Sequence, residues 1–229
     1  MIIQNYRRFL VRVFLSLLFL KFNVCAEDLK NTNNRADYII ITSSNNIETA
    51  EELAEFRNIH NSFTTMVVSI DSIKTQFSET NQNTSPDTCL RNFIQYTLLN
   101  WAEPKPKYFL LAGNVNFIPS HMELESEIFT DIAHYDSLMI DQWFIEGTDE
   151  NGKKKLFANI GRFPAWDSTS LATMIKKTID YESNEIKENW WNRAIVLKDY
   201  CLEDGLAFEN DAKSVQQKIA SIWSDTISV

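Results

Sequence analysis

Carboxylate side chains gather in a part of the sequence that has few signals for regular secondary structure. Six of them lie between residues 131 and 150: Asp131, Asp136, Asp141, Glu146, Asp149 and Glu150. Hard cations prefer oxygen ligands from such irregular chain, and Ca²⁺ takes about 6–8 of them. The stretch is therefore a candidate calcium site, although its spacing is not that of an EF-hand. A solvated acidic loop is the alternative, and spacing alone favours it.

Histidine and cysteine, the other residues with metal-binding or catalytic chemistry, form no recognisable constellation. The three histidines, His60, His121 and His134, lack the H-E-x-x-H spacing of a zinc site. Each is interpreted as a surface or structural residue. Cys89 falls in a predicted helix, where a small core residue is the default interpretation, and neither Cys89 nor Cys201 has a histidine close in sequence. The serine elbow G-x-S-x-G is absent from the sequence.

A glycine directly follows the apolar run YFLLA, and such a strand end often opens a binding loop in α/β proteins. Phosphate binding would need either G-x-x-x-x-G-K-[ST] or G-x-G-x-x-G. Gly113 is followed instead by Asn-Val-Asn-Phe-Ile-Pro, and the chain has only five glycines in all. Nucleotide binding is therefore disfavoured.

Arg162 follows another apolar run, FANIG at 157–161. An arginine at the end of a sheet strand lies near the crevice where α/β proteins bind ligands. Its guanidinium fork could clamp the carboxylates of a ligand. The interpretation favoured here is a structural ion pair with one of the acids of the carboxylate-rich stretch.

Strands and helices alternate along the chain. Apolar and β-branched runs predict strands at 37–42, 63–70, 108–112, 157–161 and 193–199, with one more beginning at 225. Helical periodicity and capping residues predict helices over 48–61, 90–101, the segment after Asp167 or Ser168, and 208–223. Asn151-Gly152 favours a hairpin. The order predicts an α/β fold with a largely parallel sheet and helices on both faces. Because the last strand has only begun, the domain is expected to be incomplete at its C-terminus.

Residues 1–26 have the layout of a secretory signal peptide: early arginines, an apolar run and Val24-Cys25-Ala26 before a cut. A membrane anchor is the alternative, but the uninterrupted apolar run covers only residues 13–20, far short of the about 20 that a span needs. A polar spacer, 27–35, follows. Signal removal takes four basic residues and no acids, so the formal net charge changes from −9 to −13. Such a surface repels nucleic acid, and the mature chain is expected to be secreted, with no transmembrane segment.

Four segments in a common order resemble the gingipain family of cysteine peptidases, family C25. They are YFLLAGNVNFIPS at 108–120, DIAHY at 131–135, FANIGRFP at 157–164 and IKKTIDYES at 175–183. A tryptophan pair and the strand RAIVLKD then follow, as in the family. The resemblance spans residues 36 to 200.

The resemblance implies a caspase-like fold in two subdomains, with residues 36–229 covering the first and the start of the second. The family's catalytic pair is a His in Gly-His-Gly and a Cys at the end of a later strand. Both would lie beyond this sequence, so no catalytic residue is assigned. Calcium binding in the family points to Asp131 and Asp141 as metal ligands. Asn114 stands where the family has an aspartate, which puts a metal role there in doubt.

The function implied by the resemblance is that of a secreted cysteine endopeptidase, present here as an N-terminal part that lacks the His/Cys dyad and is inactive alone. Protein or peptide substrates would be its partners in the complete enzyme, and calcium its structural cofactor. The alternative is a non-catalytic secreted α/β module that binds a partner or serves as a scaffold.

Overall fold

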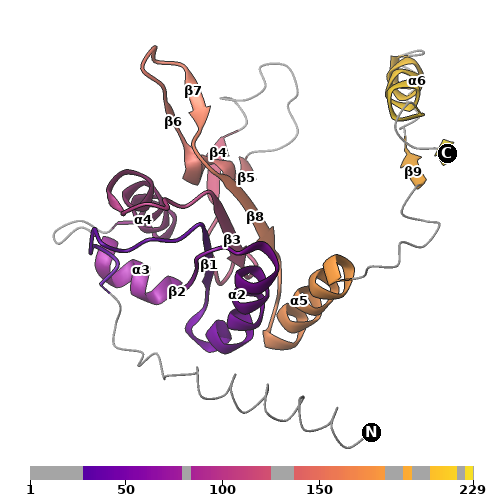
Figure 1. Ribbon diagram of the computed structural model, residues 1–229. Coiled ribbons are helices and arrows are strands. Elements are labelled where there is room, and N and C mark those ends of the chain that lie inside the picture. The colour runs from indigo at the N-terminus through magenta and orange to yellow at the C-terminus, as the bar shows by residue number, and fades with distance from the viewer. Residues whose placement is uncertain are drawn as a thin grey trace, which may run out of the picture. The chain divides into compact units, whose positions relative to one another are not determined.

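The computed structural model describes residues 28–78, 84–124, 137–183, 193–197, 207–220 and 225–228. The chain divides into two compact units, residues 1–177 and 178–229. The first unit is built around a parallel sheet, and the second contains a pair of strands and a helix (Figure 1). The candidate site lies in the first unit.

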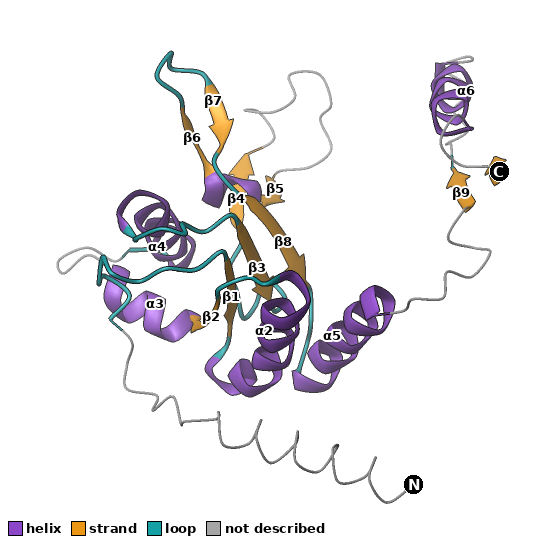
Figure 2. Ribbon diagram, in the orientation of Figure 1, coloured by secondary structure: helices purple, strands orange, loops and turns teal. Residues whose placement is uncertain are grey.

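Four parallel strands form the sheet of the first unit in the order β2-β1-β3-β8. Their sequences are rich in β-branched and aromatic residues, which suit a pleated, buried surface. Parallel neighbours require crossover connections. Helices connect β1 to β2 and β2 to β3, whereas the described chain between β3 and β8 forms two hairpins and a short 3-10 helix (Figure 2). The strands are β1 (Tyr38–Thr42), β2 (Thr65–Ser69), β3 (Tyr108–Ala112) and β8 (Asn159–Phe163).

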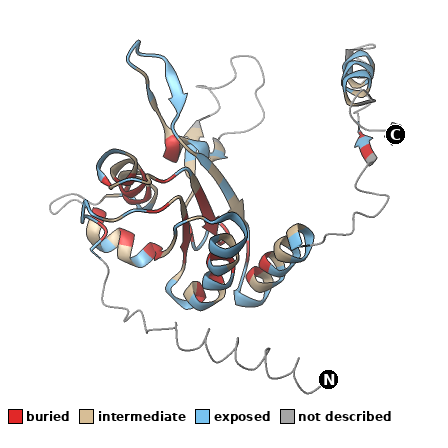
Figure 3. Ribbon diagram, in the orientation of Figure 1, coloured by how far each residue is buried: buried red, intermediate tan, exposed pale blue. Residues whose placement is uncertain are grey.

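Side-chain alternation divides the buried residues between two layers. Ile39 and Ile41 of β1 belong to the main core cluster, which also contains Phe93 and other residues of α3 (Ile70–Phe77) and α4 (Pro86–Asn100). Ile40 lies on the opposite face, because successive side chains of a strand point to opposite sides. It is also fully buried. Figure 3 shows the central strands of the sheet largely in red, the colour of buried residues.

Helices α2 (Ile47–Asn61) and α5 (Ser168–Ser183) lie on that opposite side of the sheet (Figure 1). The predicted α/β fold, with a largely parallel sheet and helices on both faces, is confirmed.

Local signals explain where several of these helices begin and end. Pro86 occupies the first turn of α4, where its missing N–H costs nothing. Asp167 accepts a hydrogen bond from the Ser170 backbone N–H at 2.7 Å, as the sequence predicted for the start of α5. Helix α2 ends at Ser62, whose φ of 57° places it in the left-handed conformation.

The region between β3 and β8 is more regular than its sequence suggested. Two antiparallel hairpins occupy its described part, with a short 3-10 helix, η3 (Gln142–Ile145), between them. The hairpin predicted around Asn151-Gly152 is confirmed, but its loop is wider than a two-residue turn, since the first strand ends at Thr148 and the second begins at Lys154. Within the loop, Asp149 accepts hydrogen bonds from the backbone N–H groups of Asn151 and Lys153. The strands are β4 (His121–Leu124) with β5 (Ser137–Ile140), and β6 (Glu146–Thr148) with β7 (Lys154–Leu156).

The segment that the sequence predicted as a polar spacer is packed against the fold. Leu29 is 1% exposed and belongs to the core cluster. Its backbone carbonyl accepts a hydrogen bond from the Trp101 indole N–H at 3.1 Å, and its N–H donates to the Gln76 side chain. The folded unit therefore begins before residue 36.

The second unit, described by itself, pairs β9 (Arg193–Val196) in parallel with β10 (Asp225–Ser228), and α6 (Ala207–Ala220) connects them. Two parallel strands need a long crossover connection, usually one that contains a helix, and this connection has both properties. Ala194 and Val196 of β9 are buried, whereas Ile195 is 65% exposed. Across the described part of both units, no helix combines the length and the apolar character that crossing a membrane requires.

Candidate functional site

Arg162 of β8 is held by a dense set of acceptors at the carboxyl edge of the sheet. Its Nε and Nη2 atoms each donate to the Asp141 carboxylate at 2.8 Å, the fork geometry that arginine and carboxylate prefer. Its Nη1 donates to the backbone oxygens of Gly113 and Ile118, both at 2.8 Å, and Nη2 also donates to Pro119. The structural ion pair predicted for Arg162 is confirmed.

This arrangement fastens three elements together. Asp141 immediately precedes η3 and also accepts a hydrogen bond from the Ser120 hydroxyl at 2.8 Å. Arg162 comes from the edge strand β8, and its carbonyl partners lie in the loop that follows β3. The side chains of Arg162 and Asp141 are 12% and 25% exposed, so the pair is shielded from water. Its donors and acceptors are engaged within the protein, which suits a structural role better than ligand binding.

The loop after β3 is shaped by this arginine and by close packing. A Cβ added to Gly113 would lie 3.0 Å from Cγ1 of Ile118, which is fully buried, so glycine is needed here for close approach. Asn114 is 5% exposed and its Oδ1 accepts from the Asn116 N–H, while its Nδ2 has no hydrogen-bond partner among the described residues. The loop turns the chain at the sheet edge.

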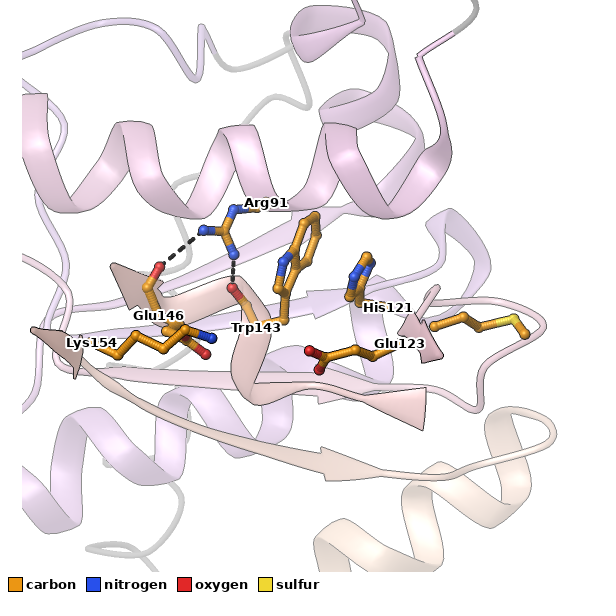
Figure 4. A pocket seen from close by; sticks show the side chains of 7 residues that line it. Arg91, His121, Glu123, Trp143, Glu146 and Lys154 are labelled. Atoms are coloured by element: carbon orange, nitrogen blue, oxygen red, sulfur yellow. Dashed lines mark hydrogen bonds and ion pairs between the residues drawn. The ribbon is translucent and has the colours of Figure 1, made fainter. Parts of the chain in front are cut away.

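A pocket of about 470 Å³ lies beside this arrangement, between α4, β4, η3 and the β6–β7 hairpin (Figure 4). Its chemistry is mixed: three residues carry basic or imidazole groups, two carry carboxylates, and one is a large aromatic. The lining residues are Arg91, His121, Met122, Glu123, Trp143, Glu146 and Lys154.

Trp143 forms a rigid wall of the pocket because both faces of its indole are covered. The Arg91 guanidinium lies over one face, 4.2 Å from the ring centroid, and the His121 ring stacks on the tryptophan at 3.7 Å and 9°. Arg91 also donates hydrogen bonds to the backbone oxygens of Trp143 and Glu146. Figure 4 shows the order Arg91, Trp143, His121 across the pocket. The cation–π contact and the hydrogen bonds together fix η3 on α4.

His121 is itself anchored from the far side. Its Nδ1 lies 2.9 Å from Oδ2 of Asp87, at the start of α4, and both side chains are largely shielded. Partial burial raises the pKa of Asp87, but hydrogen bonds from His121, Ser85 and backbone N–H groups outweigh it, so the pKa lies below the ordinary 3.8. The carboxylate therefore stays ionised in this pair and orients the imidazole.

The remaining charged groups of the pocket are unequally satisfied. Lys154 donates to Oε1 of Glu146 at 2.8 Å. The pKa of Lys154 is raised first by its hydrogen bond to Glu146 and further by that charge, with a smaller contribution from Glu123. Within the described part of the chain, the Glu123 carboxylate itself makes no hydrogen bond or ion pair.

The residues singled out in the sequence are distributed over several places. Cys89 is 2% exposed and burial raises the pKa of its thiol, which is the environment of an inert core residue. His60 lies in the last turn of α2, its ring stacked on Phe56. His121 belongs to the pocket. His134 and Cys201 lie outside the described residues.

The predicted calcium ligands are not tested by this arrangement. Asp131 lies outside the described residues, and Asp141 has both oxygens engaged by a guanidinium, whose charge opposes a cation beside it. Among residues with described side chains, no cluster of three or more His, Cys, Asp or Glu could hold a metal ion. The described side chains alone therefore do not fit calcium, and a site completed by Asp131 stays a prediction.

Sequence reasoning did not find the pocket. Its residues come from positions 91, 121, 143 and 154, and no local pattern joins them. The available signal was partial: Trp143 and Arg91 are large side chains in or beside segments predicted as strand or helix, but their stacking depends on how η3 packs against α4.

Comparisons with known proteins agree with this architecture. A model of peptidase family C25 matches residues 31–229. The solved structure of the Arg-specific cysteine proteinase gingipain R is similar, with a TM-score of 0.59 and 18% identity over 86% of this chain. A dimeric latent PorU from Porphyromonas gingivalis gives a TM-score of 0.49 and 19% identity over 64% of this chain. Curated proteins give no significant match by sequence. The chain spans 41% of the gingipain R structure and 15% of the PorU structure, and likeness at these identities concerns the fold.

Proposed function

The chain belongs to peptidase family C25, and from this membership we propose that it forms the N-terminal part of a secreted cysteine endopeptidase of the gingipain type. The observation that carries the proposal is the family match over residues 31–229. The parallel sheet with helices on both faces supports it, because likeness to gingipain R extends over 86% of the chain. Polypeptides are the substrates that membership of a peptidase family implies.

In the complete enzyme, the chemistry would follow the usual course for a cysteine nucleophile. A thiolate attacks the scissile carbonyl carbon, the C–N bond breaks, and a histidine gives a proton to the leaving amine. Water then hydrolyses the acyl-enzyme and regenerates the thiolate. The one cysteine among the described residues, Cys89, is buried and has a raised pKa, so it is not suited to this role.

The part that the described residues play is to build a scaffold. The Arg162–Asp141 pair fixes the loop after β3 at the carboxyl edge of the sheet, where α/β proteins place their ligands. We assign this edge as one wall of the substrate cleft. In the complete enzyme, the His/Cys dyad would come from later segments of the chain, in a Gly-His-Gly motif and at the end of a later strand.

Reading the coding sequence beyond codon 229 tests the dyad. The proposal expects an open frame that encodes Gly-His-Gly and then an apolar strand that ends in Cys. A stop codon directly after Val229 would overturn it and favour a non-catalytic binding module.

Secretion is tested separately, by the N-terminus of the native protein. Peptide mapping of culture medium should find a mature chain that begins at Glu27, after removal of residues 1–26. A chain that retains residues 1–26 and stays with the cells would contradict secretion.

Calcium binding is tested with the same preparation. A site at Asp131 and Asp141 predicts a higher Tm when calcium is returned after EGTA treatment, and an unchanged Tm would contradict the calcium site.

A further inference from the structure

We propose that β7 is a site of limited proteolysis, at which a peptidase that cleaves after lysine cuts the Lys154–Lys155 bond and leaves two chains that stay assembled. The chain is here the substrate of another enzyme, so the inference does not depend on the proposed peptidase function. Hydrolysis adds one water across the peptide bond, and it leaves a carboxylate on Lys154 and a new amino group on Lys155. The attacking peptidase supplies the nucleophile and the general acid.

The β6–β7 hairpin has the accessibility that such a cut requires. It extends away from the four-stranded sheet (Figure 1). Residues 150–157 are all exposed, the longest such run in the described part of the chain. Among the described strands β7 pairs with β6 alone, through three register pairs. A two-stranded hairpin of this kind is only marginally stable in water, so its entry into a peptidase cleft costs little.

The register of the hairpin selects Lys154 among its three consecutive lysines. Across the loop, the Asp149 N–H donates a hydrogen bond to the Lys153 carbonyl oxygen at 2.9 Å. Hydrogen-bonded and non-hydrogen-bonded pairs alternate along an antiparallel ladder. The next register partners, Thr148 and Lys154, therefore form a non-hydrogen-bonded pair. The backbone N–H and C=O of Lys154 point away from β6, whereas those of Lys155 face β6 again.

An outward-facing carbonyl suits attack from the open edge of β7. A peptidase can bind this edge as an added strand, and its oxyanion-hole donors must reach the scissile carbonyl oxygen. That oxygen is directed outward at Lys154 but is hydrogen-bonded within the hairpin at Lys153. The Lys154 side chain is 79% exposed, and an ion pair as exposed as the one it makes with Glu146 contributes little. Its ammonium group is therefore available to the specificity pocket of a peptidase.

The other lysines described in the first unit are less suited to the same reaction. The carbonyl oxygen of Lys30 accepts from the Tyr96 hydroxyl at 2.6 Å, and that of Lys107 accepts from the Asn159 N–H at 2.9 Å. Lys105 is followed by a proline, which has no N–H to offer a peptidase. The rest lie in helices, whose backbone is coiled and hydrogen-bonded: Lys74, Lys176 and Lys177.

The cut protein should stay assembled because each side of the cut is anchored separately. Before the cut, η3 and the residue after it are hydrogen-bonded to Arg91 and Gln95 of α4. After the cut, β8 pairs with β3, and Arg162 binds Asp141 on the other chain. None of these contacts involves residues 149–155.

Limited digestion of the full chain by lysyl endopeptidase, a serine peptidase that cleaves after lysine, tests the choice of bond. Within residues 28–177, the Lys154–Lys155 bond should be cut first, as identified by the masses of the early fragments. It should be cut about tenfold faster than the Lys153–Lys154 bond, because the Lys153 carbonyl must first lose a hydrogen bond. A first cut elsewhere in this range, or equal rates at the two bonds, would overturn the proposal.

Variants separate this role from the general one of lysines on an open edge, which is to discourage pairing with other chains. Lys154→Gln should slow cleavage of the hairpin about tenfold. Its control, Lys153→Gln, makes the same charge change one residue earlier and should change the rate less than about twofold. Glu146→Gln releases the Lys154 side chain and should raise the rate about two- to fivefold. Equal rates in the two lysine variants, or slower cleavage of Glu146→Gln, would contradict the assignment; circular dichroism confirms that each variant is folded.

The cut protein itself tests whether the two chains stay assembled. Size-exclusion chromatography in buffer should give the elution volume of the intact chain, and concentrated guanidinium chloride should separate the two fragments. The Tm should fall by no more than about 4 °C, because the exposed hairpin contributes little to stability. Fragments that separate in buffer, or a larger fall in Tm, would contradict the assembled two-chain form.

Discussion

Arg162 and Arg91 hold two neighbouring regions of the first unit by similar means but leave them in different states. Each guanidinium donates hydrogen bonds to backbone oxygens outside the central sheet. Those of Arg162 go to the loop after β3, and one from Arg91 goes to Glu146, directly after η3. Arg162 adds a forked pair with Asp141, and the guanidinium and carboxylate of this pair are fully engaged, although the nearby Asn114 Nδ2 has no partner among the described residues. Arg91 adds a stack on Trp143. Across the pocket, Glu123 makes no hydrogen bond or ion pair with the described residues, although its charge acts on Lys154. A saturated set of charges builds structure, whereas an unsaturated one is available to a ligand.

The largest effect should come from breaking the saturated region. Arg162→Met leaves the shielded Asp141 carboxylate and three backbone oxygens without their donor, so we expect a loss of about 3 kcal/mol in the free energy of unfolding. Urea denaturation of the full chain measures it. Arg162→Met combined with Asp141→Leu should recover part of the loss, since no uncompensated charge remains. A loss under about 1 kcal/mol would show that the pair behaves as an exposed one.

Arg91→Met is the matched change in the open region. It removes a cation–π contact and two hydrogen bonds to backbone oxygens. The Glu146 carboxylate loses the charge of Arg91 but keeps its ion pair with Lys154. The expected loss is about 2 kcal/mol, smaller than for Arg162. Quenching of tryptophan fluorescence by acrylamide should also rise, because Trp143 loses one covered face. If Arg91→Met costs as much as Arg162→Met, the two regions are equally structural and the comparison fails.

Gly113→Ala probes how tightly the saturated region is packed. The new methyl group would lie 3.0 Å from the fully buried Ile118, so we expect a loss of about 1 kcal/mol. Gly161→Ala on β8 is the control, because an added Cβ there meets nothing within 4 Å and the same unfolded-state effect applies. Thermal unfolding should separate the two variants, and a Gly113→Ala protein at least as stable as Gly161→Ala would contradict close packing of this loop.

The smallest expected effect is the change in stability at acidic pH, where Asp87 becomes protonated. The folded pKa of Asp87 is lower than its ordinary 3.8, because hydrogen bonds outweigh partial burial. A lowered carboxyl pKa contributes stability that is present above the unfolded value and is lost as the pH falls through the folded value. The stability difference between the wild type and Asp87→Asn should therefore shrink below about pH 4. Urea denaturation at neutral and acidic pH measures this difference, and a difference that grows in acid would contradict the lowered pKa of Asp87.

The sequence predicted the parts that depend on local patterns. The central strands β1 and β3 carry unbroken apolar runs, α2 and α4 carry helical periodicity, and these elements lie where expected. Arg162 was predicted to form a structural ion pair with one of the acids of the carboxylate-rich stretch, and Asp141 is that partner. A largely buried charge requires such a partner.

Some features that the sequence did not predict depend on tertiary packing. The β4–β5 hairpin was missed because its strands are short. The eight-residue helix α3 was also missed, although Ile70, Ile73 and Phe77 follow helical spacing. Strand β8 begins two residues later than predicted, at Asn159, because pairing with β3 sets its register. The pocket needed the packing of η3 against α4, which no spacing in the sequence reveals.

The proposed function is that this chain, a member of peptidase family C25, supplies scaffold to a cysteine peptidase whose dyad lies outside the described residues. The most direct measurement is hydrolysis of labelled casein by the purified chain 27–229 and by the same chain extended through its following coding sequence, each with and without iodoacetamide. The account predicts no hydrolysis by the first and alkylation-sensitive hydrolysis by the second. Alkylation-sensitive hydrolysis by the chain 27–229, abolished by Cys201→Ala, would contradict it.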